Sequence, residues 1–355
     1  MQDWVKNQNY LTSSSSHFSN YVTLSSDQEV SNKTLKDCNV DLDVTMSMTF
    51  TEITSNDLLF NFVAMCHGNG KFVAMTDAGD TISSSDGNTW TKSQIITVSQ
   101  LMQNWKWICY ADNQFVALNS GAAVAFSTDG TTWNVDTCKG SHGGAFNSFC
   151  YGNGIFVAVD KNSNIIYSED AITWSQSGEV APTASAFLYY GGGYFIVMHN
   201  TQPGVVNYST DGIHWTWNNV YSGVMSATVT SMCYGNGYYV AVCNSSRNFI
   251  YTNDPTGAWT KGSFPMSGFW KSVAFGGGTF AAIEDTGTLV YTTDLTGVWN
   301  MDSKAKIYAL ICYGDGNFVA VGNGCAMYTS NMNPIQSLSS MLTSILSRLT
   351  ALESS

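Results

Sequence analysis

Short apolar runs alternate with glycine-rich and Asp-centred turns along most of the chain. An apolar run, a Gly/Asn turn and a second apolar run recur seven times, a pattern typical of a tight β-hairpin. The copies read CHGNGKFVAM from Cys66, CYADNQFVAL from Cys109, CYGNGIFVAV from Cys150, YYGGGYFIVM from Tyr189, CYGNGYYVAV from Cys233, AFGGGTFAAI from Ala274 and CYGDGNFVAV from Cys312.

Six of these hairpins are followed by a further strand, an Asp-centred turn and a Trp-bearing strand, as in STDGTTW ending at Trp133. The aromatic residue after the first turn recurs at intervals of 38 to 44 residues, from Phe72 to Phe318. Four short strands fit that length, which is one blade of a β-propeller. We therefore predict an all-β, seven-bladed β-propeller over residues 45–333.

The seventh copy stops at Asn331 before any Trp-bearing strand, which leaves its blade with three strands. The segment Thr45–Ile53 (TMSMTFTEI) alternates apolar and polar residues and has no partner of its own. We predict that this N-terminal strand closes the last blade as its outermost strand, because closure covers sheet edges that invite aggregation.

Two segments flank the predicted propeller. Residues 1–44 are rich in Ser, Asn and Thr and predict a polar N-terminal connector without a core of its own. Residues 334–355 carry an apolar a/d heptad seam, which favours a C-terminal coiled-coil helix that joins copies of the chain. A helix docked on its own propeller is the alternative. The seam, which does not fix the number of chains, consists of Ile335, Leu338, Leu342, Ile345, Leu349 and Leu352.

The composition excludes several classes of function. The formal net charge is −12, and the chain holds two arginines and twelve unclustered lysines, which argues against nucleic-acid binding. No stretch approaches the roughly 18 apolar residues of a transmembrane helix, so we expect no membrane insertion. The histidines lack metal-ligand spacing and no CxxC pair occurs, so we predict no metal and no cofactor. Five cysteines share one repeat position and are expected to be free thiols: Cys66, Cys109, Cys150, Cys233 and Cys312.

An aromatic residue stands where the innermost strand begins in five of the seven predicted blades. Stacking of these rings on a sugar is the functional interpretation, and packing of blade against blade is the alternative. The loops before the innermost strands vary in length and sequence, which is typical of recognition loops on a rigid scaffold. The loops are residues 93–104, 136–147, 177–185, 218–228 and 262–268. The ring residues are Phe62, Trp105, Phe146, Trp270 and Tyr308, and the secondary candidates in or beside the loops are His142, Trp217 and Tyr221.

A glycosidase needs two carboxylates about 5 to 9.5 Å apart. Candidates exist, but nothing in the sequence pairs them, and the Asp residues that recur in nearly every blade are expected to form turns. We therefore predict that the chain is not an enzyme. The candidate carboxylates are Asp77, Asp80, Asp160, Glu179 and Glu284.

Three parts of the chain resemble viral structural proteins. The stretch TLSSDQEVSNKTL, residues 23–35, resembles a segment of the fibre and spike proteins of tailed bacteriophages, with departures at Glu29, Val30 and Ser31. The DGxTW and DPTGAW turns resemble those of phage and large-virus structural proteins, and the C-terminal seam resembles trimerising fibre ends. The SxDGxTW turn is also similar to the Asp-box of sialidases, where the box is structural, but it is one residue shorter. Sialidases use three arginines, and the predicted propeller has only Arg247.

The resemblance implies a homotrimeric virion tail fibre or spike, a receptor-binding protein that assembles with other virion tail proteins. It also implies that the propeller attaches to a host-surface molecule, with a glycan as the favoured receptor. The alternative is a bacterial adhesin or lectin of the same architecture, acting at the bacterial cell surface. A polysaccharide-degrading enzyme is the third possibility.

Overall fold

The computed structural model describes residues 48–329 apart from 49, 56–57, 96–103, 141–144, 181–185, 200–204, 220–227, 245 and 305. The chain divides into two compact units, Met1–Met48 and Thr49–Ser355, and the description below concerns the second. The predicted connector (residues 1–44) and the predicted coiled-coil helix (residues 334–355), with its six seam residues, lie outside the described residues.

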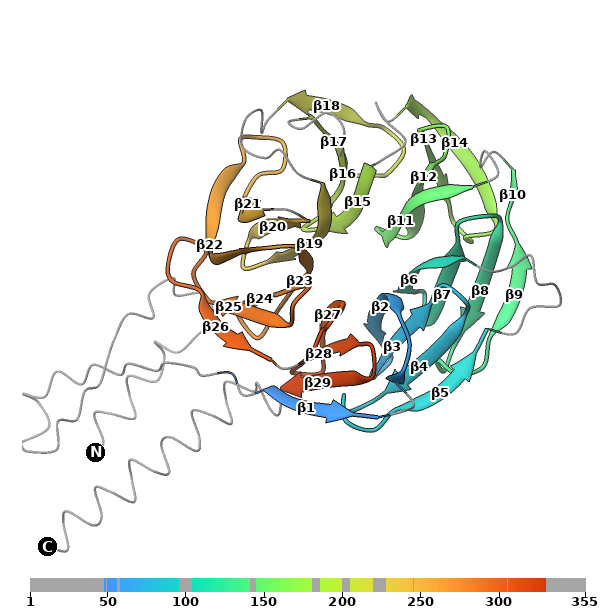
Figure 1. Ribbon diagram of the computed structural model, residues 1–355. Helices are drawn as coiled ribbons and strands as arrows, with labels where there is room; N and C mark the ends of the chain where they lie inside the picture. The colour runs from blue at the N-terminus through green and yellow to red at the C-terminus, as the bar shows by residue number, and fades with distance from the viewer. Residues whose placement is uncertain are drawn as a thin grey trace, which may run out of the picture. The chain divides into compact units, whose positions relative to one another are not determined.

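Seven antiparallel blades surround a central axis, which confirms the predicted seven-bladed β-propeller (Figure 1). Consecutive strands pair within each blade, and the chain runs outward from the axis. The described residues contain no α-helix. The innermost strands are β2 (Phe62–Gly68), β6 (Trp105–Ala111), β11 (Phe146–Gly152), β15 (Ala186–Gly191), β19 (Val229–Gly235), β23 (Trp270–Gly276) and β27 (Leu310–Gly314).

The two middle strands of each blade hold most of the buried side chains. In β3, for example, every residue from Phe72 to Thr76 is buried, because both sides of the strand face a neighbouring blade. The second strands are β3 (Lys71–Thr76), β7 (Gln114–Asn119), β12 (Ile155–Asp160), β16 (Tyr194–His199), β20 (Tyr238–Cys243), β24 (Thr279–Glu284) and β28 (Asn317–Gly322). The third strands are β4 (Asp80–Ser84), β8 (Ala123–Ser127), β13 (Asn164–Ser168), β17 (Val205–Ser209), β21 (Ser246–Thr252), β25 (Thr288–Thr292) and β29 (Cys325–Thr329).

The outermost strands form the rim and are largely exposed. They are β5 (Thr91–Gln94), β9 (Asn134–Thr137), β14 (Thr173–Val180), β18 (Thr216–Asn219), β22 (Thr260–Gly268), β26 (Asn300–Ser303) and β1 (Phe50–Thr54). Strand β1 pairs antiparallel with β29, in register from Phe50 opposite Thr329 to Thr54 opposite Cys325. The N-terminal strand therefore closes the last blade, as predicted, with its described part beginning at Phe50.

Two kinds of turn shape each blade. The innermost hairpin turns place an Asn, Asp or Gly and the next residue at positive φ, as at Asn69 (47°) and Gly70 (68°), which is the geometry of a type I′ turn. In the Asp-centred turns the aspartate carboxylate accepts hydrogen bonds from backbone N–H groups of the turn. Asp129 Oδ1 accepts the backbone N–H groups of Thr131 and Thr132, each at 2.7 Å.

The antiparallel order defines two faces of the propeller. The innermost hairpin turns and the Asp-centred turns lie at the same ends of the strands, on what we call the turn face. The innermost strands begin at the opposite ends, on what we call the loop face. The Lys71 Nζ group donates a hydrogen bond of 2.8 Å to the carbonyl of Asp129, so an innermost turn contacts the Asp-centred turn of the next blade.

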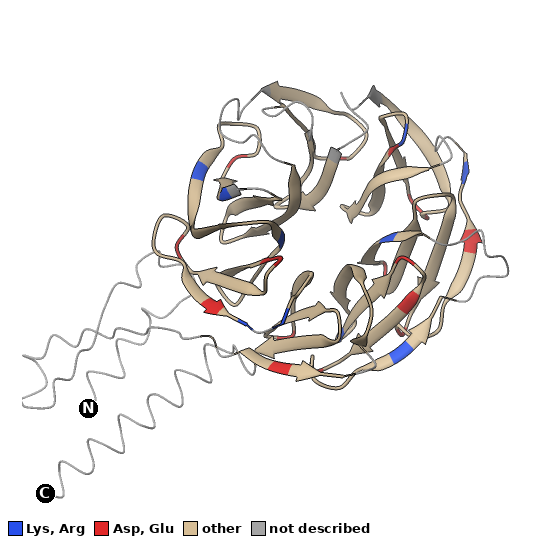
Figure 2. Cartoon of the chain, viewed as in Figure 1, with Lys and Arg blue, Asp and Glu red and all other residues tan. Residues whose placement is uncertain are grey.

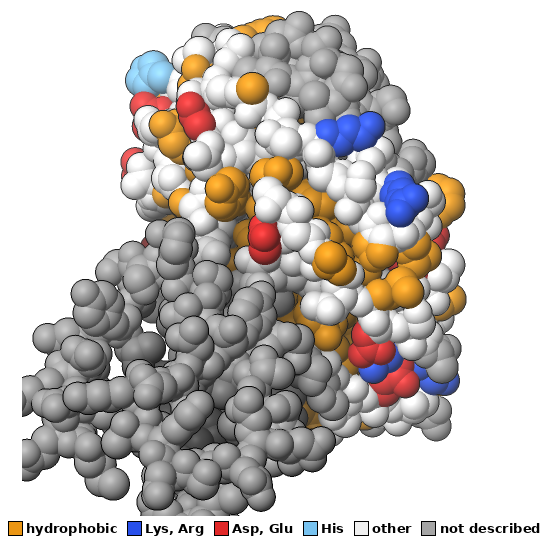
Figure 3. Space-filling view, turned by 90° about the vertical axis from the view of Figure 1, so that its left-hand side faces the viewer, with side chains coloured by type: hydrophobic (Ala, Val, Ile, Leu, Met, Phe, Trp, Pro, Cys, Tyr) orange, Lys and Arg blue, Asp and Glu red, His pale blue; other side chains and the backbone are white. Residues whose placement is uncertain are grey.

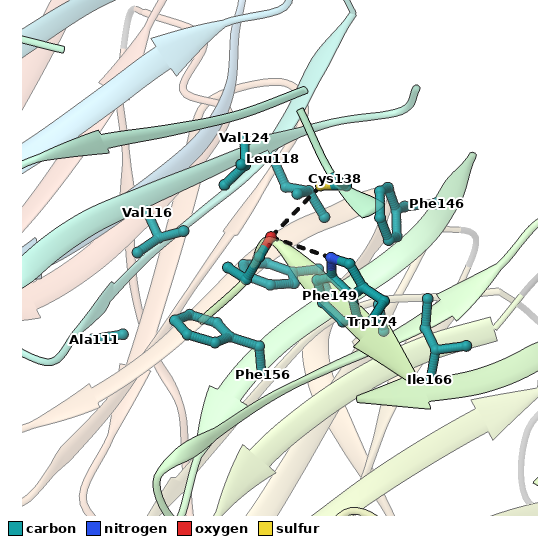
Figure 4. Close-up of a cluster of buried hydrophobic side chains, with 12 residues drawn as sticks. Ala111, Val116, Leu118, Val124, Cys138, Phe146, Phe149, Phe156, Ile166 and Trp174 are labelled. Carbon is teal, nitrogen blue, oxygen red and sulfur yellow. Dashed lines mark hydrogen bonds between the residues drawn. The ribbon is translucent and has the colours of Figure 1, made fainter. Parts of the chain in front are cut away.

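The core consists of side chains packed between neighbouring blades. Figure 4 shows one such cluster, in which Leu118 and Val124 of one blade meet Phe149, Phe156 and Trp174 of the next. The indole N–H of Trp174 donates a hydrogen bond of 3.1 Å to the carbonyl of Ala171. The repeated Trp of this blade thus fills the space between two blades.

Parts of the predicted variable loops belong to strands, and two segments show this most clearly. Residues 262–268 belong to the rim strand β22, because the side chain of Phe264 is buried and its ring lies 3.9 Å from that of Trp270. Residues Lys139–Gly140, within another predicted loop, form the short strand β10, which pairs parallel with β14 of the next blade.

Candidate functional site

The five predicted ring residues lie on the loop face, where the innermost strands begin, and all of them are buried. Trp105, Trp270 and Tyr308 have no exposed surface, and Phe146 and Phe62 have 2% and 6%. The rings contact the protein itself: Trp270 packs on Phe264, and the centroids of Phe146 and Trp174 are 5.2 Å apart. This burial favours the packing alternative. Stacking of a sugar on these rings stays a prediction that requires the covering residues to move.

The secondary candidates divide between described and undescribed residues. Trp217 lies on the rim strand β18 and is 51% exposed. It is therefore open to a ligand. His142 and Tyr221 lie outside the described residues.

Two candidate carboxylates, Asp160 and Glu284, are fully buried and hold turns on the loop face. Asp160 Oδ1 accepts the N–H groups of Asn162 and Asn164, each at 2.8 Å, and Glu284 accepts those of Thr286 and Thr288. Burial acts to raise the pKa of Glu284, but the hydrogen bonds from Thr286 and Thr288 outweigh it and the pKa is lowered. These contacts assign both carboxylates to turn structure.

The Asp-centred turns show the same local chemistry at the surface. The pKa of Asp129 is lowered: desolvation acts to raise it, and the N–H groups of Thr132 and Thr131 with the hydroxyl groups of Thr131 and Ser127 outweigh that effect. Asp86, Asp170, Asp211, Asp254 and Asp294 also have lowered pKa values. This repetition is typical of a structural role.

The repeated cysteines are free thiols, as predicted. Burial raises the pKa of Cys66 well above its usual value, with smaller contributions from Cys109 and Cys312. A raised pKa keeps the thiol protonated and unreactive. Among the described residues no group of three His, Cys, Asp or Glu could hold a metal ion, and no helix is long and apolar enough to cross a membrane.

A collar of rings surrounds the axis near the turn face. Each ring packs at a tilt or edge to face on the aromatic residue that follows the turn of its own blade, as Tyr110 does on Phe115 with centroids 5.0 Å apart. Most of the rings also cover a glycine of the preceding blade, where a β-carbon would overlap the ring. The collar consists of His67, Tyr110, Tyr151, Tyr190, Tyr234, Phe275 and Tyr313.

Polar groups of the collar contact the preceding blade. The Tyr151 hydroxyl donates a hydrogen bond of 2.6 Å to Asp112, and His67 Nε2 lies 3.0 Å from Asp315 Oδ2. Desolvation, with Asp112 beside it, raises the pKa of Tyr151 to about 12. The collar thus joins neighbouring blades around the axis.

Blades four and five carry additional tyrosines on the turn face. Tyr194 and Tyr238 occupy the position directly after the innermost turn, and Tyr238 is 38% exposed. The other five blades place Lys71, Gln114, Ile155, Thr279 and Asn317 there. Tyr194 packs against the buried cluster between blades four and five, but the fold accepts very different side chains at this position, so packing does not require two neighbouring tyrosines. These tyrosines are not among the candidates predicted from the sequence, because those candidates are aromatic residues at the other end of the strands.

Charged and apolar side chains mark different parts of the surface. Figure 2 shows lysines and arginines scattered singly around the propeller, and the sequence has none between Lys161 and Arg247. Figure 3 shows apolar side chains gathered on the rim toward the side where β22 and β26 lie. On and beside β26, Met301 is 55% and Val298 is 85% exposed.

Solved structures of other propellers match this fold. Virginiamycin B lyase from Staphylococcus aureus aligns at 12% identity over 80% of this chain and 100% of its own, with a TM-score of 0.66. YCF48 from Cyanidioschyzon merolae aligns at 13% identity over 79% and 98%, with a TM-score of 0.63. The Pan2 WD40 domain of Neurospora crassa aligns at 12% identity over 79% and 95%, with a TM-score of 0.60. No protein-family model and no curated protein matches the chain.

These likenesses define the class of the protein as a seven-bladed β-propeller. At 12–13% identity they show the fold alone, and the neighbours differ in function. Function therefore has to be argued from the surfaces described above.

Proposed function

We propose that the chain is a receptor-binding protein of a virion, a tail fibre or spike that attaches through its propeller to a glycan on the host surface. The observation that supports this proposal most is the presence of exposed aromatic side chains, Trp217 and Tyr238, on a rigid framework of buried strands. Tyr and Trp offer a large amphipathic contact area at a small cost in conformational entropy. The sequence resemblance to fibre proteins supports the viral setting, and the heptad seam supports a homotrimer.

The contacts of the carboxylates favour a binding protein over an enzyme. Asp160 and Glu284 each bond to the backbone of their own turn, and the lowered pKa of Glu284 is opposite to that required of a general acid. A turn-holding carboxylate is not available to protonate a leaving group. The proposed activity is therefore attachment without cleavage.

Glycan binding by the purified full chain tests this proposal. The chain is applied to a printed panel of neutral, sialylated and glucuronate-containing glycans, and each bound glycan is assayed for released reducing ends. Binding without release is expected. Release of reducing ends would make the chain a polysaccharide-degrading enzyme, and a complete lack of binding would remove the glycan receptor. Mass spectrometry of purified virions distinguishes a virion protein from a bacterial adhesin.

A further inference from the structure

The turn face of blades four and five carries a group of tyrosines whose rings are exposed or half-buried. Tyr234 is 36% and Tyr238 is 38% exposed, and the two flank the turn at Asn236 and Gly237. Tyr194 is half-buried and belongs to the blade before them. We call Tyr194, Tyr234 and Tyr238, with Tyr239 beneath them, the tyrosine sector.

The sector is held in place by contacts within and between the two blades. The Tyr239 hydroxyl donates a hydrogen bond of 2.8 Å to the carbonyl of Gly191 in blade four. The Tyr234 ring packs on Tyr239 at a tilt, with centroids 4.6 Å apart, and a β-carbon at Gly192 would lie 2.6 Å from the Tyr234 ring. Blade four therefore passes directly under a ring of blade five.

The outer rings are braced as well. Tyr194 meets Tyr208 edge to face with centroids 6.3 Å apart, and Tyr238 meets Tyr251 in the same way at 6.1 Å. These edge-to-face contacts fix the orientation of the Tyr194 and Tyr238 rings, and each contact covers only part of the ring surface. A preorganised aromatic surface loses little conformational entropy when a ligand binds.

The tyrosine hydroxyls of the sector supply hydrogen-bonding groups. Among the described residues, the hydroxyls of Tyr194, Tyr234 and Tyr238 have no protein partner, whereas that of Tyr239 is engaged. Tyr194 packs against the buried cluster that contains Tyr239, and the Tyr234 ring contacts Tyr239, so both rings lie at the boundary between the two blades. The sector therefore offers rings that can stack on the apolar face of a sugar and hydroxyls that can hydrogen-bond to its polar edge.

The charges near the sector favour an uncharged ligand. The chain has no lysine or arginine from residue 162 to residue 246, and the neighbouring Asp-centred turns carry Asp211 and Asp254. The pKa values of both carboxyls are lowered, so both are ionised at neutral pH. An acidic sugar would meet both carboxylates, and the lysine of blade five at this end of the strands, Lys261, lies on the rim strand β22.

We propose that the tyrosine sector is the carbohydrate-binding surface of the propeller and that it takes a neutral sugar, stacked on Tyr194, Tyr234 and Tyr238 and hydrogen-bonded to their hydroxyls. This inference rests on the proposed function and specifies its site and sugar class. It places the ligand on the turn face, opposite the buried ring of Trp105 and Trp270.

The test compares variants on the same glycan panel, which includes neutral glycans ending in mannose, galactose, glucose, N-acetylglucosamine, fucose or rhamnose. The Y194A/Y238A double variant removes two outer rings, and Tyr234→Phe removes one hydroxyl without changing the packing. The matched control is Q114A/N317A, at the same turn position of two other blades. Thermal melting of each variant shows whether it remains folded.

We expect binding of a neutral glycan that weakens at least tenfold in Y194A/Y238A, weakens severalfold in Tyr234→Phe and is unchanged in Q114A/N317A. Normal binding by the folded double variant overturns the tyrosine sector and leaves the proposed function standing, with Trp217→Ala as the next variant. Binding of acidic glycans alone contradicts the neutral class. Binding of no glycan by the unmodified chain contradicts both the inference and the glycan receptor.

Discussion

The Tyr308 hydroxyl donates a hydrogen bond of 2.9 Å to Glu52 on the closing strand, 256 residues earlier in the sequence. Tyr308 is buried just before the innermost strand β27, and Glu52 lies on β1 at the rim. Lys304, which also precedes β27, forms a hydrogen bond to the carbonyl of Phe50. The last blade is therefore joined to the N-terminal strand by side chains as well as by the β1–β29 ladder.

Deleting residues 50–54 should unfold the propeller or lower its melting temperature sharply, because β29 loses its partner and becomes an exposed edge. Tyr308→Phe keeps the strand and removes one hydrogen bond, so it should lower the free energy of unfolding by only about 1 kcal/mol. Circular dichroism melting of both variants makes the comparison. A deletion variant that melts like the full chain would show that closure is dispensable.

Gly235→Ala should be strongly destabilising, by about 3 kcal/mol, because its β-carbon would overlap the Phe275 ring of the next blade. At Gly237 nothing lies within 4 Å of an added β-carbon, and only the positive φ of 79° opposes the substitution. Gly237→Ala should therefore cost about 1 kcal/mol. Urea unfolding measures both variants, and equal losses would mean that the collar is not tightly packed.

Trp105→Ala should lower the free energy of unfolding by about 3–5 kcal/mol, because the ring is fully buried. Trp217→Ala removes a ring that is 51% exposed and should change the melting temperature little. The sugar-stacking interpretation of the buried ring instead requires that replacement of Trp105 and Trp270 abolish glycan binding without loss of folded protein. If both folded yield and melting temperature survive Trp105→Ala, the ring is free to bind a ligand.

Much of the fold could be predicted from the sequence because each copy of the repeat contains the strands and turns of one blade. The Asn69–Gly70 turn and the Asp129 turn are local, and each fixes its hairpin through its own backbone geometry. The closing strand was predictable because β29 had no local partner. The strand character of residues 262–268 was not, because it depends on the burial of Phe264 against Trp270, a contact between blades.

The candidate site was less predictable, because a repeated aromatic residue has the same appearance in the sequence whether it is buried or exposed. Trp105 and Trp270 were chosen for their position at the strand start, and burial between blades decides against an open surface there. The tyrosine sector had a signal in the sequence: Tyr194 and Tyr238 stand where other blades have unrelated residues. The structure adds that these tyrosines belong to adjacent blades and lie on the same face of the propeller.

Acid should destabilise the propeller through its Asp-centred turns. Their carboxyl pKa values are lowered in the folded state, so the stability that they contribute is fully present above the unfolded value of 3.8. That stability is lost as the pH falls through the lower folded values. The melting temperature should therefore fall below about pH 4. Asp129→Asn should be somewhat less stable at pH 7 but show a shallower acid decline, and an unchanged decline would exclude Asp129 as a contributor.

The mass of the full chain in solution tests the predicted coiled coil, which lies outside the described residues. Light scattering of the full chain is compared with a version that ends at residue 333. We expect about three times 38.5 kDa for the full chain and a monomer for the truncation, because the heptad seam from Ile335 to Leu352 would be removed. A trimer would present several propellers at once and raise the avidity for a repeated surface glycan without any new contact in the propeller. If both versions are monomers, the seam packs on its own chain, and attachment must depend on the affinity of a single propeller.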